Sequence, residues 1–267
     1  MAFTLHEKDG LSWLTADVLN VKHMFTRRLG EPGEFPYTSS PDPVWSAEAV
    51  QERVRRLWLR LREAGGFPEE GFAFTRQVHG TDIRFVTEDD RLLPPLTMRP
   101  ADCDGLITDR PGVPLCVFTA DCVPVLFHEP ERGLACAVHS GWKGTVKDMM
   151  GSAVRAVTAM GGKPEKLRAA IGPAISRCCF EVGPEVKEAM EAWLGPDARD
   201  LCPPEEGVPG KYMADLKEAN RRRLLQLGVR AEHIEVSADC TMCMSDVYWS
   251  HRATKGHRGT MASIIML

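Results

Sequence analysis

The stretch TADCVPVLFHEPERGLACAVHSGWKGT, from Thr119 to Thr145, decides how the rest of the chain is organised. Its two apolar runs, Val123 to Phe127 and Leu134 to Val138, have the length of short strands. The polar segment Glu129 to Gly133 between them contains a proline and a glycine, which are turn signals. The stretch therefore predicts an antiparallel pair of apolar strands joined by a hairpin turn.

One ligand-type residue stands at the open end of each predicted strand. Cys122 precedes the first strand and His139 follows the second, so the pairing would bring both side chains to one edge. The segment Ser140 to Gly144 ends the strand, and a helical pattern follows from about Thr145 to Met160. Backbone N–H groups of the first helical turn would point back at the same edge. This edge is the predicted site.

Periodic segments on both sides of the hairpin predict further strands and helices. No linker divides the 267 residues, which indicates one α/β domain spanning residues 1–267. Ser46 is the expected N-cap of the first helix. The expected strands are Leu11–Leu14, Asn20–Phe25, Phe72–Val78, Ile83–Thr87, Leu167–Ile171 and Met261–Leu267, and the expected helices are Trp45–Ala64, Pro184–Trp193 and Met213–Leu227.

The composition argues against several classes of partner. A net charge of -4 and a pI of about 6.1 give no electrostatic reason to expect nucleic acid or an anionic membrane. The N-terminal segment mixes charges into every few residues, unlike a signal or transit peptide, and no apolar run approaches a membrane span. Nine cysteines without a secretory signal favour reduced thiols and a cytoplasmic location. Small polar or phosphorylated ligands remain as expected partners, and the sequence does not identify a protein partner.

Three ligand-type residues stand at the ends of separate predicted strands. His79 follows the strand that begins at Phe72, and with Cys122 and His139 it forms a set of two nitrogens and one thiolate. Such a set suits zinc, and three protein ligands leave a fourth position for water, as in catalytic zinc sites. A rival hypothesis makes Cys122 a nucleophile and His139 its base in covalent acyl chemistry. A histidine beside a turn is also common at protein surfaces without any ligand role.

Charged residues at other strand ends allow two interpretations each. Arg27 and Arg28 follow a predicted strand and could hold an anion or form a solvated basic turn. Asp104 precedes an apolar strand and is either a turn-capping carboxylate or an acid/base group at the site edge.

Four further cysteines form two short motifs. Cys178 and Cys179 are adjacent, so an ordinary backbone does not let them bond to each other, and they are either buried apolar residues or thiols that line a site. We expect one of each. The motif Cys240-Thr241-Met242-Cys243 is a single C-x-x-C, a weak zinc signal because zinc sites usually need a second pair.

Five ordered motifs resemble those of one known family. They are RQVHGTD at 76–82, TADCVPVLF at 119–127, AVHSGWKGT at 137–145, IGPAISRCCFEVG at 171–183, and CTMC with SHR near the end of the chain. On these motifs the chain is similar to the laccase-domain or polyphenol oxidase family. That family, once called multicopper polyphenol oxidases, is now regarded as purine nucleoside phosphorylases with adenosine deaminase activity. The resemblance is dense over residues 70–183 and thinner towards both ends.

The resemblance implies a fold, a metal and an activity. The implied fold is α/β (α+β), with layered mixed β-sheets flanked by helices, similar to the cytotoxic necrotizing toxin catalytic domain. The family's metal ligands correspond to His79, Cys122 and His139, with zinc as the implied metal and copper as an alternative. The implied activity is zinc-dependent phosphorolysis of adenosine, inosine or methylthioadenosine, together with adenosine deamination.

Further roles follow from this interpretation. Besides Cys122 and His139, the expected catalytic residues are Asp104 and Glu181, as first and second candidates for the proton shuttle in deamination. Substrate and phosphate contacts are expected from Arg27, Arg28, Lys143 and Arg252.

The chain departs from the family pattern at both ends. Phe25-Thr26-Arg27 is not followed by the family's glycine pair and serine, and Thr260 stands where an arginine is common, with Arg258 nearby. These departures concern substrate contacts and not the metal.

Three alternatives to the nucleoside enzyme remain. One is a Cys/His or zinc amide hydrolase that edits a peptidoglycan precursor, since the family has also been linked to that process. Another is a non-catalytic zinc-binding partner protein. The weakest is a copper polyphenol oxidase, because the eight histidines include no His-x-His pair for a multicopper centre.

Overall fold

The central hairpin of the fold is the one that the sequence predicts. The computed structural model describes residues 3–29, 48–93 and 101–267. Strands β9 (Val123–Glu129) and β10 (Leu134–Ser140) pair antiparallel, and the register places His139 opposite Pro124. Cys122, one residue before β9, and His139 therefore lie at the same end of the pair, as predicted.

Every residue of β9 and β10 is buried, because both faces of the hairpin are covered. Successive side chains of a strand point to opposite faces. Val125 and Phe127 belong to a core shared with helices, whereas Leu126 packs into a second core shared with another sheet. This two-sided burial explains why the strands read as continuous apolar runs instead of alternating ones.

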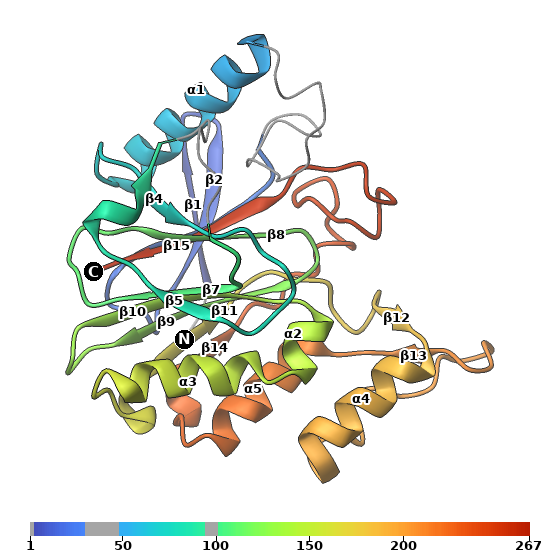
Figure 1. The fold of residues 1–267 in the computed structure, drawn as a ribbon. Helices are drawn as coiled ribbons and strands as arrows, with labels where there is room; N and C mark the ends of the chain where they lie inside the picture. The colour runs from blue at the N-terminus through green and yellow to red at the C-terminus, as the bar shows by residue number, and fades with distance from the viewer. Residues whose placement is uncertain (1–2, 30–47, 94–100) are drawn as a thin grey trace.

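The strands form two mixed sheets that pack face to face (Figure 1). Parallel pairs such as β4 with β8 and β5 with β7 stand beside antiparallel ones. A six-stranded sheet has the order β14-β11-β9-β10-β7-β5, and a seven-stranded sheet has the order β1-β2-β3-β15-β8-β4-β6. The remaining strands are β1 (Phe3–Lys8), β2 (Leu11–Ala16), β3 (Lys22–Thr26), β4 (Phe72–Phe74), β5 (Ile83–Phe85), β6 (Arg91–Leu92), β7 (Gly105–Thr108), β8 (Leu115–Thr119), β11 (Arg168–Ile171), β14 (Ile234–Val236) and β15 (Met261–Met266), with β12 (Glu181–Val182) and β13 (Tyr212–Met213) as a separate pair.

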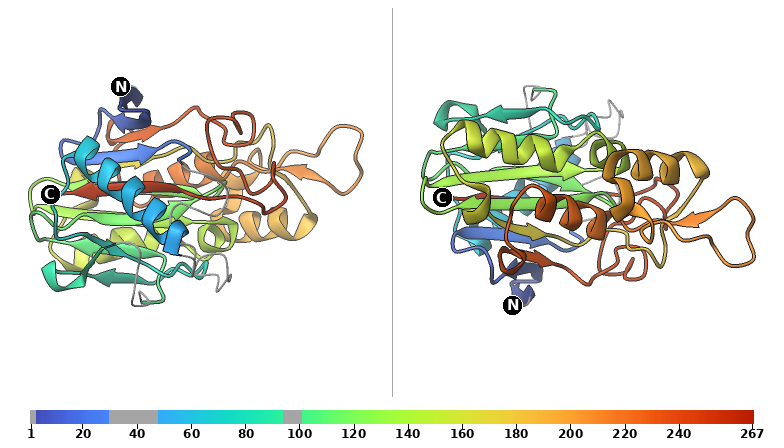
Figure 2. Two further views of the ribbon diagram at one scale, coloured as in Figure 1. Left: turned by 90° about the horizontal axis from the view of Figure 1, so that it is seen from above. Right: turned by 90° about the horizontal axis from the view of Figure 1, so that it is seen from below.

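Helices cover the outer faces of both sheets. Helix α1 (Glu48–Gly65) lies across the seven-stranded sheet, where Trp58 and Leu61 pack against Phe72 and Ile264 (Figure 2). On the other side, α3 (Met149–Ala159) and α5 (Leu216–Gln226) lie over the six-stranded sheet, as the view from below shows. The short helix α2 (Trp142–Val146) follows β10, and α4 (Pro184–Leu194) packs against α2 to one side of the sheet. The predicted mixed, layered α/β (α+β) fold is thereby confirmed.

One expected helix is interrupted. The pattern from Thr145 to Met160 is divided between α2, which begins earlier at Trp142, and α3. Asp148 separates the two helices with φ 75°, and its carboxylate then caps α3 by accepting from Gly151 N. A left-handed residue cannot continue an α-helix, so the prediction of one continuous helix was wrong.

Six of the described strands had no counterpart in the prediction. Two are long: β1, whose residues are mostly exposed, and β8, whose segment Leu115–Thr119 is almost fully buried. The other four are the short strands β6, β12, β13 and β14. The start of the first expected helix, with Trp45 and Ser46, lies outside the described residues. Among the described residues, no helix is long and apolar enough to cross a lipid bilayer.

Candidate metal centre

His79, Cys122 and His139 converge from three segments of the chain. His79 lies in the loop after β4, Cys122 just before β9, and His139 in β10. One ligand atom from each residue lies within 4.8 Å of the others. Cys122 Sγ is 4.0 Å from His79 Nε2, and the two imidazole rings are edge to face with centroids 4.9 Å apart. The three residues that the sequence proposed as metal ligands thus form one cluster.

Gln77 holds the loop that presents His79. Its side-chain amide donates to Phe118 O at 2.6 Å and accepts from Phe118 N at 2.7 Å, as a neighbouring strand would. His79 itself has φ 58°, a left-handed conformation that the surrounding contacts must maintain.

Asp104 holds His139 and the loop of His79 in place through hydrogen bonds. Its carboxylate is fully buried and accepts backbone N–H bonds from Val78, His79 and Gly80 at 2.8 to 3.0 Å. Asp104 Oδ1 also accepts from His139 Nδ1 at 2.8 Å. In the neutral imidazole that bond keeps the proton on Nδ1, so the other nitrogen of His139 is available as a metal ligand. Asp104 therefore fixes both the loop of His79 and the tautomer of His139.

The cluster favours a charged carboxylate and a charged thiol. Burial would raise the pKa of Asp104, but hydrogen bonds from His139 and Gly80 outweigh it and hold the pKa below its ordinary value. Burial would likewise raise the pKa of Cys122, but the neighbouring His139 and His79 lower it to about 6. Burial lowers and the Cys122 and Asp104 charges raise the pKa of His139, with the net result about 9. Without metal, Cys122 and His139 form a thiolate–imidazolium pair.

A glycine closes one side of the cluster. A Cβ atom at Gly141 would lie 2.8 Å from His79 Cδ2 and 3.1 Å from Cys122 Sγ, so any other residue would intrude on two ligands. Two imidazoles and one thiolate are the donor types of zinc and copper sites. His79 is exposed, Cys122 half-buried and His139 buried, so the cluster is open to solvent on one side. The residues fit an open, three-ligand metal site.

A hollow of about 410 Å³ is lined by Trp142, which directly follows Gly141, and by residues of the loop after β11 and of the C-terminal segment. Trp142 and Phe180 supply aromatic walls, and Arg252 supplies a positive charge. The Arg252 guanidinium lies 5.4 Å from the Phe180 ring and donates to Glu181 O. This hollow is the candidate substrate pocket.

Glu181 lines the same hollow but lies in an ion pair. Its Oε1 is 3.1 Å from Lys211 Nζ, and the hydrogen bond from Lys211 lowers the pKa of the carboxyl. Of the two proposed proton shuttles, Glu181 thus faces the hollow, whereas Asp104 is enclosed by its four donors.

Arg27 and Arg28 pack on the C-terminal segment. The Arg27 guanidinium lies 5.8 Å from the Tyr248 ring, and the Arg28 guanidinium stacks 3.8 Å from Trp249. Tyr248 and Trp249 in turn pack on Ala120, two residues before Cys122. Arg27 Nε is buried and has no hydrogen-bond partner among the described residues.

Two further cations differ in their relation to the centre, since only Arg258 interacts with one of its ligands. Lys143 is exposed, with Nζ 5.7 Å from the Trp142 ring. Arg258 is half-buried and interacts electrostatically with Cys122 and Asp121. The sequence places Arg258 only two residues before Thr260, where the family commonly has an arginine. Its proximity to Cys122 depends on tertiary folding and has no local sequence signal.

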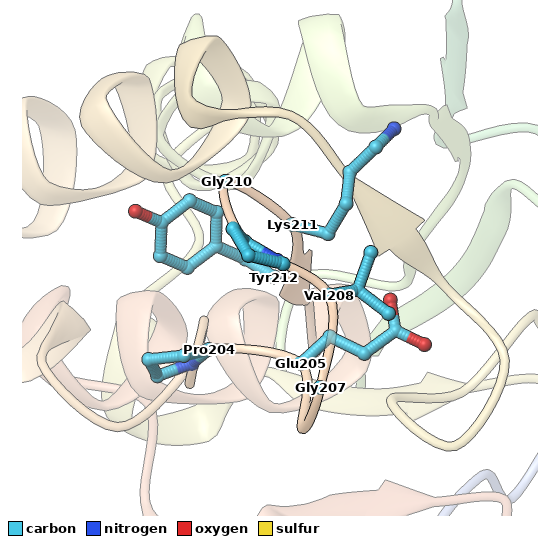
Figure 3. A pocket seen from close by; sticks show the side chains of 8 residues that line it. Pro204, Glu205, Gly207, Val208, Gly210, Lys211 and Tyr212 are labelled. Carbon is cyan, nitrogen blue, oxygen red and sulfur yellow. The ribbon is translucent and has the colours of Figure 1, made fainter.

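A second hollow, of about 290 Å³, is formed by the loop from Pro204 to Tyr212 (Figure 3). None of the predicted site residues lines it.

Comparisons with known proteins agree with the fold and with the motifs. A family model described as multi-copper polyphenol oxidoreductase laccase matches residues 22–267. The purine nucleoside phosphorylase YlmD of Geobacillus stearothermophilus is 41% identical over 209 residues, which are 77% of this chain and 76% of that protein. A purine nucleoside phosphorylase of Deinococcus radiodurans is 34% identical over 265 residues, with 97% and 94% of the two chains covered.

A protein named adenosine deaminase RL5, from an unknown prokaryotic organism, is 32% identical over 202 residues, 75% of this chain and 76% of that protein. The crystal structure of YlmD from G. stearothermophilus superposes with a TM-score of 0.86 at 34% identity and covers 99% of both chains. The chain thus belongs to the family of multi-copper polyphenol oxidoreductase laccases.

Proposed function

We propose that this chain is a zinc-dependent purine nucleoside phosphorylase, acting on adenosine, inosine and methylthioadenosine, with adenosine deamination as a second activity. The observation that carries the proposal is the open His79–Cys122–His139 cluster, which the short segment from His139 to Trp142 connects to an aromatic hollow. Relatives over most of the chain are named purine nucleoside phosphorylases, and one is named an adenosine deaminase.

The hollow suits a purine base. Trp142 and Phe180 offer faces on which a flat heterocycle can stack. Half-buried Trp142 follows Gly141, where an added Cβ would meet two of the three ligands, so we expect a base stacked on Trp142 to approach the cluster.

Phosphate would be held by arginines that meet at the C-terminal segment. Arg27 has a buried Nε without a partner among the described residues, Arg252 lines the hollow, and Arg258 approaches Cys122. In phosphorolysis a phosphate oxygen bonds to C1′ of the ribose while the bond from C1′ to the base breaks. The base leaves with the electron pair and takes up a proton. The arginines would orient the dianion and balance its charge.

His79, Cys122 and His139 would hold the metal, and Asp104 would keep His139 in the ligating tautomer. Bound zinc supplies Lewis acidity and lowers the pKa of a coordinated water. In this proposal Asp104 is a positioning residue, and Glu181 remains the carboxylate facing the hollow. All nine cysteines are free, which supports a reducing cytoplasm as the location of this one catalytic domain.

The experiment that tests the proposal combines metal analysis with an activity assay. Purified protein is analysed for zinc and copper by mass spectrometry, then assayed with adenosine, inosine and methylthioadenosine in phosphate, before and after chelation. We expect zinc, release of free base that requires phosphate, and loss of turnover on chelation that zinc restores. Release of free base at a rate that changes neither with phosphate nor with chelation would contradict the proposal.

The Arg27→Ala protein is expected to need more phosphate. Loss of a charge-assisted contact costs roughly 1.5–3 kcal/mol, which corresponds to an increase of about 10- to 150-fold in the KM for phosphate. Steady-state kinetics at varied phosphate would measure this, with Arg55→Ala as the matched control because Arg55 is exposed on α1. An unchanged phosphate KM in Arg27→Ala would remove Arg27 from the site.

A second candidate function is an amide hydrolase acting on a peptidoglycan precursor. It is favoured by one observation, the alignment of a Cys122 thiolate, His139 and Asp104, which are the elements of a cysteine hydrolase triad. Amide hydrolysis that survives chelation but is abolished by alkylation of Cys122 would establish this function in place of the first.

The alkylation of Cys122 in metal-free protein is expected to depend on pH, with a midpoint well below that of an ordinary thiol. Because His139 and His79 lower the thiol pKa to about 6, the reactive thiolate should be present above pH 6 and be lost as the pH falls below it. Iodoacetamide labelling followed by peptide mass spectrometry across pH 4–9 would give the midpoint. Saturating zinc should protect Cys122, and a midpoint near the ordinary thiol value of 9.0 would contradict the arrangement.

A further inference from the structure

A second group of four thiols lies apart from the candidate metal centre. Cys178, Cys179, Cys240 and Cys243 place their sulfur atoms within 4.8 Å of one another. Cys243 Sγ is 3.3 Å from Cys179 Sγ and 3.5 Å from Cys178 Sγ. The vicinal pair and the C-x-x-C motif, which are separate in the sequence, thus meet in space, and the C-x-x-C gains the second pair that zinc sites require.

The spacing of the sulfurs fits a shared ion better than the alternatives. A disulfide requires a separation of about 2.05 Å, and all four cysteines are free. Four sulfurs at about 2.3 Å from a tetrahedral zinc lie about 3.8 Å apart, close to the separations observed. Packing into the core does not explain the group, because Cys178 and Cys243 are exposed and Cys179 is half-buried. The expectation that one of the vicinal cysteines is a buried apolar residue was therefore wrong.

Each pair of thiols is presented by a tight turn with fixed backbone. Cys179 N and Phe180 N both donate to Ser176 O, and Met244 N donates to Cys240 O. A parallel bridge between Ala174 and Cys240 joins the two turns. Two turns clamped together in this way present four ligands without a long ordered loop, as in zinc ribbons.

The surroundings stabilise negative charge on the sulfurs. Ser176 N donates to Cys240 Sγ at 3.3 Å, and the N–H groups of Met242 and Cys243 also interact with that sulfur. The ammonium of Lys217, 5% exposed, donates to the carbonyls of Ser237 and Asp239 and interacts electrostatically with Cys240. Four thiolates around a divalent ion leave a net charge of about -2, which such donors and a buried cation offset.

We propose that Cys178, Cys179, Cys240 and Cys243 form a second metal site, a structural tetrathiolate zinc site, distinct from the His79–Cys122–His139 cluster. A closed shell of four protein ligands leaves no position for substrate. Its function is to hold the turn after β11 and the segment after β14 together.

Asp121 connects this second site to the first. The Thr241 hydroxyl, between the two cysteines of the C-x-x-C, donates to Asp121 Oδ1 at 2.6 Å, and Arg252 N donates to Asp121 Oδ2 at 2.7 Å. Ile175 N, beside the other turn, donates to Asp121 O. Asp121 directly precedes Cys122, so metal bound at the tetrathiolate site would fix the backbone on which Cys122 and Arg252 depend.

The test counts and characterises the metal in matched variants. The wild-type protein should contain about two zinc ions per chain, and Cys122→Ser/His139→Ala, which keeps all four thiols of the second site, should contain about one. Zinc X-ray absorption of that double variant should show an all-sulfur shell at about 2.3 Å without nitrogen at about 2.0 Å. Cys178→Ser/Cys243→Ser should lose one zinc, whereas Cys202→Ala, a buried cysteine that packs on Met190, should lose none.

Several results would overturn the proposal. They are a Cys122→Ser/His139→Ala protein without zinc, a zinc shell containing nitrogen in that protein, and a disulfide among the four cysteines in protein purified under reducing conditions. If Cys178→Ser/Cys243→Ser does not fold, the double variant of the first site still decides, because its tetrathiolate ligands are intact.

Discussion

The Cys122→Ser protein is expected to lose both its catalytic metal and its phosphorolysis activity. Serine replaces the one thiolate among three ligands, and a hydroxyl is a poor ligand for zinc beside two imidazoles. Lewis-acid stabilisation of several kcal/mol corresponds to a fall in kcat/KM of about 10²- to 10⁴-fold. Metal analysis and nucleoside phosphorolysis on the same preparation would measure the two losses together.

The matched control is Cys202→Ala, which removes a buried thiol that lies outside both clusters and packs on Met190. It should retain metal and activity. A Cys122→Ser protein with wild-type turnover would exclude the cluster as the catalytic centre. A protein that keeps metal but loses all turnover would favour Cys122 as a nucleophile.

The Asp104→Asn protein is expected to be strongly destabilised and to bind metal weakly. Each carboxylate oxygen accepts two hydrogen bonds, Oδ1 from His79 N and His139 Nδ1, and Oδ2 from Val78 N and Gly80 N. In either orientation of an asparagine amide, its NH₂ group would face two donors in a buried position. We expect a loss of roughly 2–5 kcal/mol in the free energy of unfolding and a loss of about 10- to 100-fold in metal affinity.

Denaturant unfolding and competitive metal titration would measure these changes. Asp102→Asn is the control, since Asp102 lies two residues earlier in an exposed ion pair with Arg76 and should change stability by less than about 1 kcal/mol. Wild-type stability and metal affinity in Asp104→Asn would show that the carboxylate does not position the centre.

The sequence predicts the elements whose pattern is local. The hairpin of β9 and β10 can be predicted because two apolar runs flank a turn that contains Pro130 and Gly133. The break between α2 and α3 cannot be predicted from the local sequence, because it depends on the left-handed conformation of Asp148. The Asp148 carboxylate also forms an ion pair with Arg223 of α5, with an N–O distance of 2.8 Å. Strand β1 was missed because it is an edge strand with mostly exposed residues, and its apolar signal is weak.

The candidate site likewise combines residues that local motifs predict with contacts that only the tertiary fold creates. Short motifs identified His79, Cys122 and His139, and the hairpin alone brings the last two together. That Asp104 contacts His139, and that Arg258 approaches Cys122, follows from pairings between distant segments. The two cysteine motifs likewise look weak when each is read alone. Their meeting depends on β11 pairing with β14, a parallel pairing between strands more than sixty residues apart.

The position of β15 has a consequence for how the protein folds during synthesis. This strand lies between β3 and β8, near the middle of the seven-stranded sheet, and its residues follow almost all others in the chain (Figure 1). Until residue 266 has been made, the facing edges of β3 and β8 lack their partner, and unpaired edges favour association with other chains. Slow, late closure of the sheet and a need for chaperone protection of the nascent chain should therefore accompany this topology.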